Sequence, residues 1–197
     1  MDAAAGGRYD LAVSTDGIRE LVRRDCEASL FGAAFYDDHV ALVARFAVTL
    51  AGPLNAEAES VELAAWLHDL AAVRDPAAQP EHPRLGAELA PGLLAPYGYE
   101  SMVSDRVAAA IASHSFPLRP GSATPEEVCL SQADAVAQIV RPVYWFYFVT
   151  TFRGLGYLEA VQWLKNLLET KWEALIEPAR RLTGDRYAAA MALLDEA

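Results

Sequence analysis

Six side chains of metal-binding types are spread along the chain in a pattern that could bring them together. The sequence contains only four histidines: His39, His68, His82 and His114. Asp69 directly follows one of them, inside the otherwise apolar segment 64–72, and Asp134 also has mainly small or apolar neighbours. A carboxylate in such surroundings is costly unless it is paired or bound to a metal. Imidazoles and carboxylates that converge from separate helices make a site for divalent Fe, Mn, Co, Ni or Zn.

The segments that carry these residues have the period of α-helices, and clear strand alternation is absent. His39 lies one turn before an apolar stripe, and His114 shares a face with Val107 and Ile111. The pattern therefore predicts an all-α fold in which these histidines lie on the buried sides of their helices.

Expected helix bounds follow from capping and breaker residues. We expect helices over about 15–30, 36–51, 56–73, 101–114, 124–141 and 157–182, a helix that starts near Pro83, a helix through the aromatic run after Pro142, and a short last helix. Gly52-Pro53 is expected to end the second helix, Pro91-Gly92 and Pro96 to break up the helix after Pro83, and residues 75–83 to form a polar loop. The length of 197 residues favours a single domain over 1–197.

The order His39, His68-Asp69, His82, His114, Asp134 resembles the H…HD…H…H…D pattern of the HD-domain superfamily of metal-dependent phosphohydrolases. The resemblance covers about residues 35–142, and residues 143–197 would then be a helical C-terminal extension. Local context agrees in three segments: Trp66-Leu67-His68-Asp69, His82-Pro83-Arg84-Leu85-Gly86-Ala87 and Ala112-Ser113-His114-Ser115.

The resemblance implies a ligand set for one or two divalent metals, with Mg²⁺ as a further candidate. The positions that match His39, His68 and Asp134 bind one metal in the family, and those that match His82 and His114 bind a second. Asp69 matches the carboxylate that bridges the two, which makes it the candidate catalytic residue that holds the metal-activated water. The presence of both extra histidines favours a dinuclear site.

Substrate contacts are expected from cations and a hydroxyl near the ligands. The candidates are Arg74, Arg84, Ser115 and Arg141, of which each Arg could equally be an ion-paired surface side chain. The cyclic-dinucleotide branch of the superfamily has a Lys at the position of Ala72 and a Gly-Tyr-Pro motif, where this chain has Gly98-Tyr99-Glu100. These departures argue against cyclic-dinucleotide hydrolysis.

The amino-acid composition limits the kinds of molecule that the protein could bind. The chain has 16 basic and 27 acidic residues, a formal net charge of −11. It lacks the cationic surplus that nucleic-acid polymers require, but a small anionic phosphate could bind if metals carry the positive charge. The first ten residues show no secretory signal, no apolar run is long enough for a membrane span, and the two cysteines form no framework. We therefore expect a cytoplasmic location.

Three functions remain open. The first is a phosphohydrolase that acts on a small phosphate ester, with a nucleotide as one candidate. The second is a di-iron oxygenase that cleaves a C–C or C–P bond, because some HD-domain relatives hold iron with a similar set of ligands. The third is a non-catalytic module, for which the aromatic run Tyr144–Phe148 would be a partner or homodimer surface.

Overall fold

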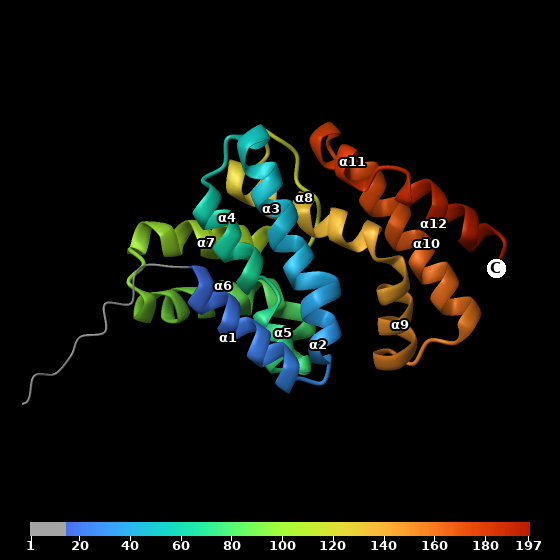
Figure 1. Cartoon of the computed structure of the whole chain (residues 1–197), viewed down its shortest axis with the longest axis horizontal. Helices are drawn as coiled ribbons and strands as arrows, with labels where there is room; N and C mark the ends of the chain where they lie inside the picture. Colours follow the sequence, from blue (N-terminus) through green and yellow to red (C-terminus); the bar gives the residue numbers. More distant parts are fainter. Residues whose placement is uncertain (1–14) are drawn as a thin grey trace, which may run out of the picture.

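The computed structural model describes residues 15–197, and in this range the protein is all α-helical with no strand (Figure 1). The predicted fold class is confirmed. The segment on which we based the absence of a secretory signal lies outside the described residues. Within them, no helix combines the length and the apolar character needed to cross a bilayer.

The helices fall into two groups that follow each other along the chain. The first group is α1 (Thr15–Ala28), α2 (Gly32–Phe35), the π-helical turn η1 (Tyr36–Val40), α3 (Ala41–Leu54), α4 (Ala58–Leu67), α5 (Leu70–Arg74), the 3₁₀ helix η2 (Pro76–Glu81), α6 (His82–Leu94), the 3₁₀ turn η3 (Ala95–Tyr97), α7 (Ser101–Ser113) and α8 (Pro125–Val140). The second group is α9 (Pro142–Phe152), α10 (Tyr157–Ala174), α11 (Glu177–Thr183) and α12 (Arg186–Asp195). Figure 1 shows the second group beside the first, joined to it through α8.

The core lies where α3, α4, α7 and α8 pack on one another. Helix α8 is buried on nearly every side, because α3 and α7 cover it within the first group and α10 and α11 cover it from the second. Its start is well defined: the Thr124 hydroxyl accepts from the Glu127 N–H, and the Glu127 carboxylate accepts from the Thr124 N–H. This capping box confirms the predicted start of the helix.

The aromatic run forms helix α9 and packs mainly inward. Tyr144, Trp145 and Phe148 are buried, and the Phe148 ring centroid lies 5.5 Å from that of Phe31. Tyr147 is the most exposed ring of the run. Most of the run is thus used to dock α9 onto the first group, and the homodimer surface stays a prediction.

Several predicted helix boundaries are wrong. Helix α3 continues through Gly52-Pro53 to Leu54, because Pro53 costs only one hydrogen bond so near the end; Asn55, with φ +55°, provides the actual stop. Helix α6 likewise runs through Pro91, and the expected loop before it contains η2. The long helix expected over 157–182 ends at Ala174, because Leu175 and Ile176 adopt extended conformations.

The close packing of α6 on α7 depends on a glycine. A Cβ atom at Gly86 would lie 3.0 Å from Cγ2 of Ile111 and 3.3 Å from the carbonyl oxygen of His68. At Gly92, in the same helix, a Cβ atom would meet nothing within 4 Å.

We expect Gly86→Val to destabilise the protein by about 1–3 kcal/mol, since overpacking against a backbone carbonyl cannot be relieved by a rotamer change. Gly92→Ala is the matched control and should stabilise by about 0.4–1 kcal/mol. Chemical denaturation of both variants checks this. A Gly86→Val protein as stable as the wild type would contradict the packing described.

Candidate metal centre

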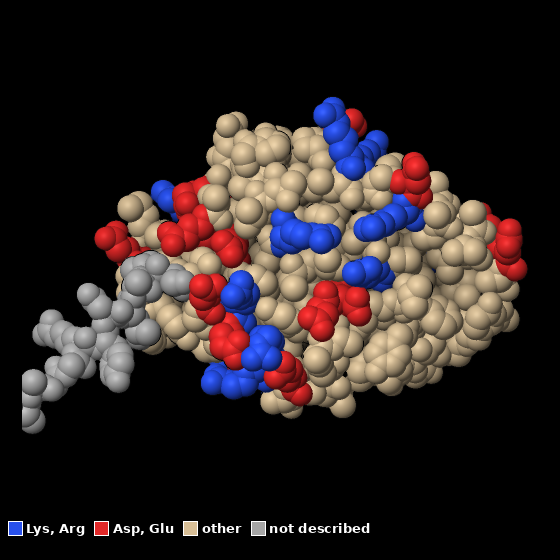
Figure 2. Space-filling model, viewed as in Figure 1, with Lys and Arg blue, Asp and Glu red and all other residues tan. Residues whose placement is uncertain are grey.

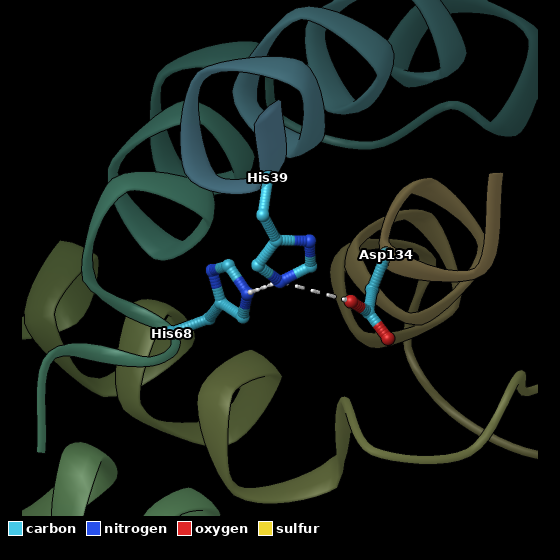
Figure 3. A group of neighbouring side chains, drawn as sticks. All are labelled: His39, His68 and Asp134. Carbon is cyan, nitrogen blue, oxygen red and sulfur yellow. Dashed lines mark hydrogen bonds and ion pairs between the residues drawn. The ribbon is translucent and has the colours of Figure 1, made fainter. Parts of the chain in front are cut away.

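The six predicted ligands lie together in the middle of the first group of helices, although they come from five different elements or junctions. His39, His68, His114 and Asp134 are buried, with at most 3% of each residue's surface exposed. Figure 3 shows three of them, His39, His68 and Asp134, pointing toward one another from separate segments. The sequence spacing therefore corresponds to a single cluster.

His39 is presented by a π-helical turn that helical periodicity did not predict. The turn η1 spans Tyr36–Val40 between α2 and α3. A π turn inserts an extra residue into a helix and rotates the side chains that follow, and such turns are frequent at functional sites. The His39 ring also packs against Trp145 and Phe35, with centroids 5.0 and 5.1 Å away.

His68 and Asp69 lie at a break between α4 and α5, not within one helix as predicted. Asp69 has φ −104° and ψ 3°, outside the α-helical region. In a continuous helix, adjacent side chains point about 100° apart. The break changes that angle, so that His68 Nε2 and Asp69 Oδ2 lie 3.2 Å from each other.

The two oxygens of Asp69 face two different pairs of histidines. Oδ2 lies 3.1 Å from Nε2 of His39 and 3.2 Å from Nε2 of His68. Oδ1 lies 3.1 Å from Nε2 of His82 and 3.6 Å from Nε2 of His114. Asp69 is thus central to the cluster, the position that a shared carboxylate ligand would occupy.

Asp134 completes the cluster from α8. Its Oδ1 lies 3.5 Å from Nε2 of His39, and both of its oxygens accept from the side-chain amide of Gln138 at 3.1 and 3.0 Å. Its Oδ2 lies 3.4 Å from Nζ of the buried Lys171, whose ammonium also donates to the Ser115 carbonyl at 3.0 Å.

Hydrogen bonds to backbone carbonyls determine which ring nitrogen carries the proton in three of the imidazoles. Nδ1 of His68, His82 and His114 lies 2.7–2.8 Å from the carbonyl oxygens of Ala65, Gln79 and Ile111. A carbonyl only accepts, so each Nδ1 carries a proton, and Nε2 presents a lone pair to the cluster whenever the ring is neutral.

These lone pairs fit a metal. Nε2 of His82 lies 3.2 Å from Nε2 of His114, and Nε2 of His39 lies 3.1 Å from Nε2 of His68. Two lone pairs so close repel unless a proton or a cation lies between them. Nitrogens that bind one ion at about 2.0–2.1 Å lie roughly 3 Å apart. The group His39, His68, Asp134 and the group His68, Asp69, His114 each place their ligand atoms within 4.8 Å of one another.

The cluster also sets the charges of its members. Burial acts to raise the pKa of Asp69, but the charge of His68 and hydrogen bonds from His114, His39 and His68 hold it well below its usual value. Burial acts to lower the pKa of His82, yet its hydrogen bond and attraction to Asp69 raise it above 6.5. The pKa of Asp134 is lowered because Lys171 and the histidines outweigh burial.

A cavity of about 530 Å³ opens onto the cluster and is lined by residues of both groups of helices. Asp69, His82, His114 and Asp134 reach it from the first group of helices. One face of α10 forms the opposite wall, at the spacing i, i+3, i+4, i+7, i+8: Trp163, Asn166, Leu167, Thr170 and Lys171. Residues far from the ligands in sequence therefore shape the space in which a substrate would lie.

The structure brings one of the four expected substrate contacts to this cavity. Ser115 lines it. The three arginines do not, and each forms an ion pair elsewhere: Arg74 with Asp25 at 2.7 Å, Arg84 with Glu81 and Glu88 at 2.7 and 2.6 Å, and Arg141 with Asp38 at 3.1 Å. Figure 2 shows acidic and basic side chains interspersed on one face, several of them side by side.

Two cations that sequence reasoning missed line the cavity instead, Lys171 and Arg153. Both lie beyond the segment of the family resemblance. A signal was present for Lys171, because it lies eight residues after Trp163 and therefore on the same face of an amphipathic helix. Arg153 follows the last residue of α9, where no periodicity applies.

A helical bundle that gathers four imidazoles and two carboxylates beneath a cavity has the ligand types of a divalent-metal site. The HD domain family model matches residues 36–139, more than half of the chain. The chain belongs to this family, within the superfamily of metal-dependent phosphohydrolases. No curated protein matches it significantly.

Three solved structures share this fold over most of both chains. Bacillus subtilis YpgQ superposes with a TM-score of 0.69 at 21% identity over 95% of each chain. The complex of YpgQ with ADP superposes with a TM-score of 0.65 at 23% identity, over 93% of this chain and 95% of that one. A predicted HD superfamily hydrolase from an uncultured Thermotogales bacterium gives 0.57 at 24% identity, over 92% and 89%. These likenesses extend the shared fold to the C-terminal helices.

We expect metal binding to depend on pH through His82. Its raised pKa means that the folded, metal-free protein retains a proton that the metal must displace. The stability that this proton gives the metal-free protein is complete below about pH 6.5 and is lost as pH rises through the raised pKa. The increase in Tm on adding Mn²⁺ should therefore grow between pH 6 and 8, and His82→Gln should flatten that dependence. An equal slope in both proteins would contradict the assignment.

We expect Lys171→Met to destabilise the metal-free protein by roughly 3–5 kcal/mol, because it leaves the buried Asp134 without its cation. Saturating Mn²⁺ should recover part of this loss, since a metal replaces the missing charge. Denaturation with and without metal measures both values. A loss below 1 kcal/mol without metal would contradict the pairing.

Proposed function

We propose that the protein is a phosphohydrolase that cleaves a small phosphate ester with water. The observation that carries this proposal is the arrangement of Asp69, whose two oxygens face two histidine pairs at the floor of an open cavity. This arrangement suits a carboxylate shared by two divalent ions, with His39, His68 and Asp134 as further ligands of one ion and His82 and His114 of the other.

When bound, such ions neutralise phosphoryl oxygens and lower the pKa of a water molecule that serves as the nucleophile. The protein's own contribution is to orient the ligand side chains before a metal binds. Backbone carbonyls keep three Nε2 lone pairs directed inward, and Gln138 together with Lys171 holds the Asp134 carboxylate. Ligands fixed in this way need little rearrangement on binding a metal.

A nucleoside phosphate is the substrate type that we favour. Phe116, Trp145 and Trp163 line the same cavity as the ligands, and Phe116 is 74% exposed. Aromatic faces beside a phosphate-binding floor suit a ligand that combines a planar base with an anion. The volume of about 530 Å³ accommodates a molecule of that size.

Asp69→Ala should abolish both metal retention and turnover, because it removes the ligand that both halves of the cluster share. Phosphate release from a panel of nucleotides and sugar phosphates, with Mn²⁺, Co²⁺, Ni²⁺, Mg²⁺ and Fe²⁺ tested separately, would identify substrate and metal. Asp25→Ala is the matched control, since Asp25 pairs with Arg74 outside the cavity.

Three outcomes would overturn the proposal. Stoichiometric metal in Asp69→Ala would refute the ligand assignment. A mixed-valent iron EPR signal with O₂ consumption would favour the oxygenase alternative. Metal-loaded protein that releases no phosphate from any member of the panel would favour a non-catalytic module.

A further inference from the structure

Arg153 differs from the arginines that the sequence suggested, because it lies at the cavity. It lines the 530 Å³ cavity and also a smaller adjoining one of about 40 Å³, and Asp69 borders both spaces. Among the Lys and Arg side chains of residues 15–197, Arg153 and Lys171 line the larger cavity. Lys171 is already paired with Asp134, whereas Arg153 has no carboxylate partner among the residues that the structure describes.

The guanidinium of Arg153 has unused hydrogen-bonding capacity. Within residues 15–197 no ion pair or side-chain hydrogen bond engages it, although the chain as a whole is strongly acidic. Asp69 does not capture it, because both Asp69 oxygens face histidine nitrogens. The donors of Arg153 are thus free to bind an anion that enters the cavity.

The position of Arg153 is nonetheless constrained. Its backbone N–H donates to the Val149 carbonyl at 3.2 Å and so caps α9, and Gly154 follows with φ +67°. Its guanidinium carbon lies 5.6 Å from the centroid of the Trp163 ring, which also lines the cavity. Contact with an aromatic face leaves the in-plane N–H groups of a guanidinium available, in the fork that matches phosphate oxygens.

We propose that Arg153, positioned by Trp163, binds a phosphate oxygen of the substrate. This inference rests on the proposed function and adds a residue to it from outside the segment that the family model matches. Arg153 is not among the metal ligands, so its removal weakens anion binding and leaves metal binding intact. The C-terminal extension would then supply substrate affinity to a metal centre built by the first group of helices.

The test is calorimetric titration of inorganic phosphate into the full-length, Mn²⁺-loaded protein, with metal content measured in parallel. Arg153→Gln should bind phosphate roughly ten-fold more weakly at unchanged Mn²⁺ stoichiometry. The phosphate affinity of Arg153→Lys should lie between those of the wild type and Arg153→Gln, because lysine keeps the positive charge but lacks the paired N–H groups of a guanidinium. Arg181→Gln is the matched control: Arg181 belongs to the same extension, pairs with Glu177 and does not line the cavity.

Phosphate affinity of Arg153→Gln within two-fold of the wild type would overturn the proposal, as would an equal loss in Arg181→Gln or a wild type that binds no phosphate. Loss of Mn²⁺ from Arg153→Gln would also overturn it, because the residue would then act on the metal centre. Failure of the proposed function is a separate result, namely wild-type protein that binds phosphate but releases none from any substrate.

Discussion

The Nε2 atoms of four imidazoles and the charges of two carboxylates are brought together at the centre of this protein, and the rest of the structure depends on how they are satisfied. Nε2 of His82 and Nε2 of His114 face each other at 3.2 Å while their Nδ1 protons are held by backbone carbonyls. Without a cation or a proton between them, such groups repel in a medium of low polarity. A divalent metal resolves this conflict most fully.

Local departures from regular helix are explained by the same requirement. The π-helical turn at His39 and the break at His68-Asp69 both sacrifice regular hydrogen bonding in order to direct side chains into one cluster. The C-terminal helices border the cavity beside the cluster, and one face of α10 forms a wall of it. Lys171, on the same helix, compensates the charge of Asp134. In this acidic chain, the positive charge for a phosphate substrate would come from the metals and from Arg153.

Helical periodicity predicted the helical fold class, and the resemblance to the HD-domain pattern predicted the six residues that cluster. The sequence did not predict the π turn or the interruption at Asp69, since the apolar pattern of 64–72 is the same in a continuous helix and in a broken one. It placed substrate contacts at Arg74, Arg84 and Arg141 from proximity along the chain, whereas local acidic partners such as Asp38 hold them at the surface. Arg153 could be found only from the tertiary packing of α9 and α10.

We propose that Asp69 lies between two metal positions, one beside His39, His68 and Asp134 and the other beside His82 and His114. Anomalous X-ray diffraction from crystals of the Mn²⁺-loaded protein tests it most directly. Two anomalous peaks should flank the Asp69 carboxylate, one within coordination distance of each histidine pair. Mn²⁺ bound elsewhere, with no peak beside Asp69 in an intact fold, would contradict it.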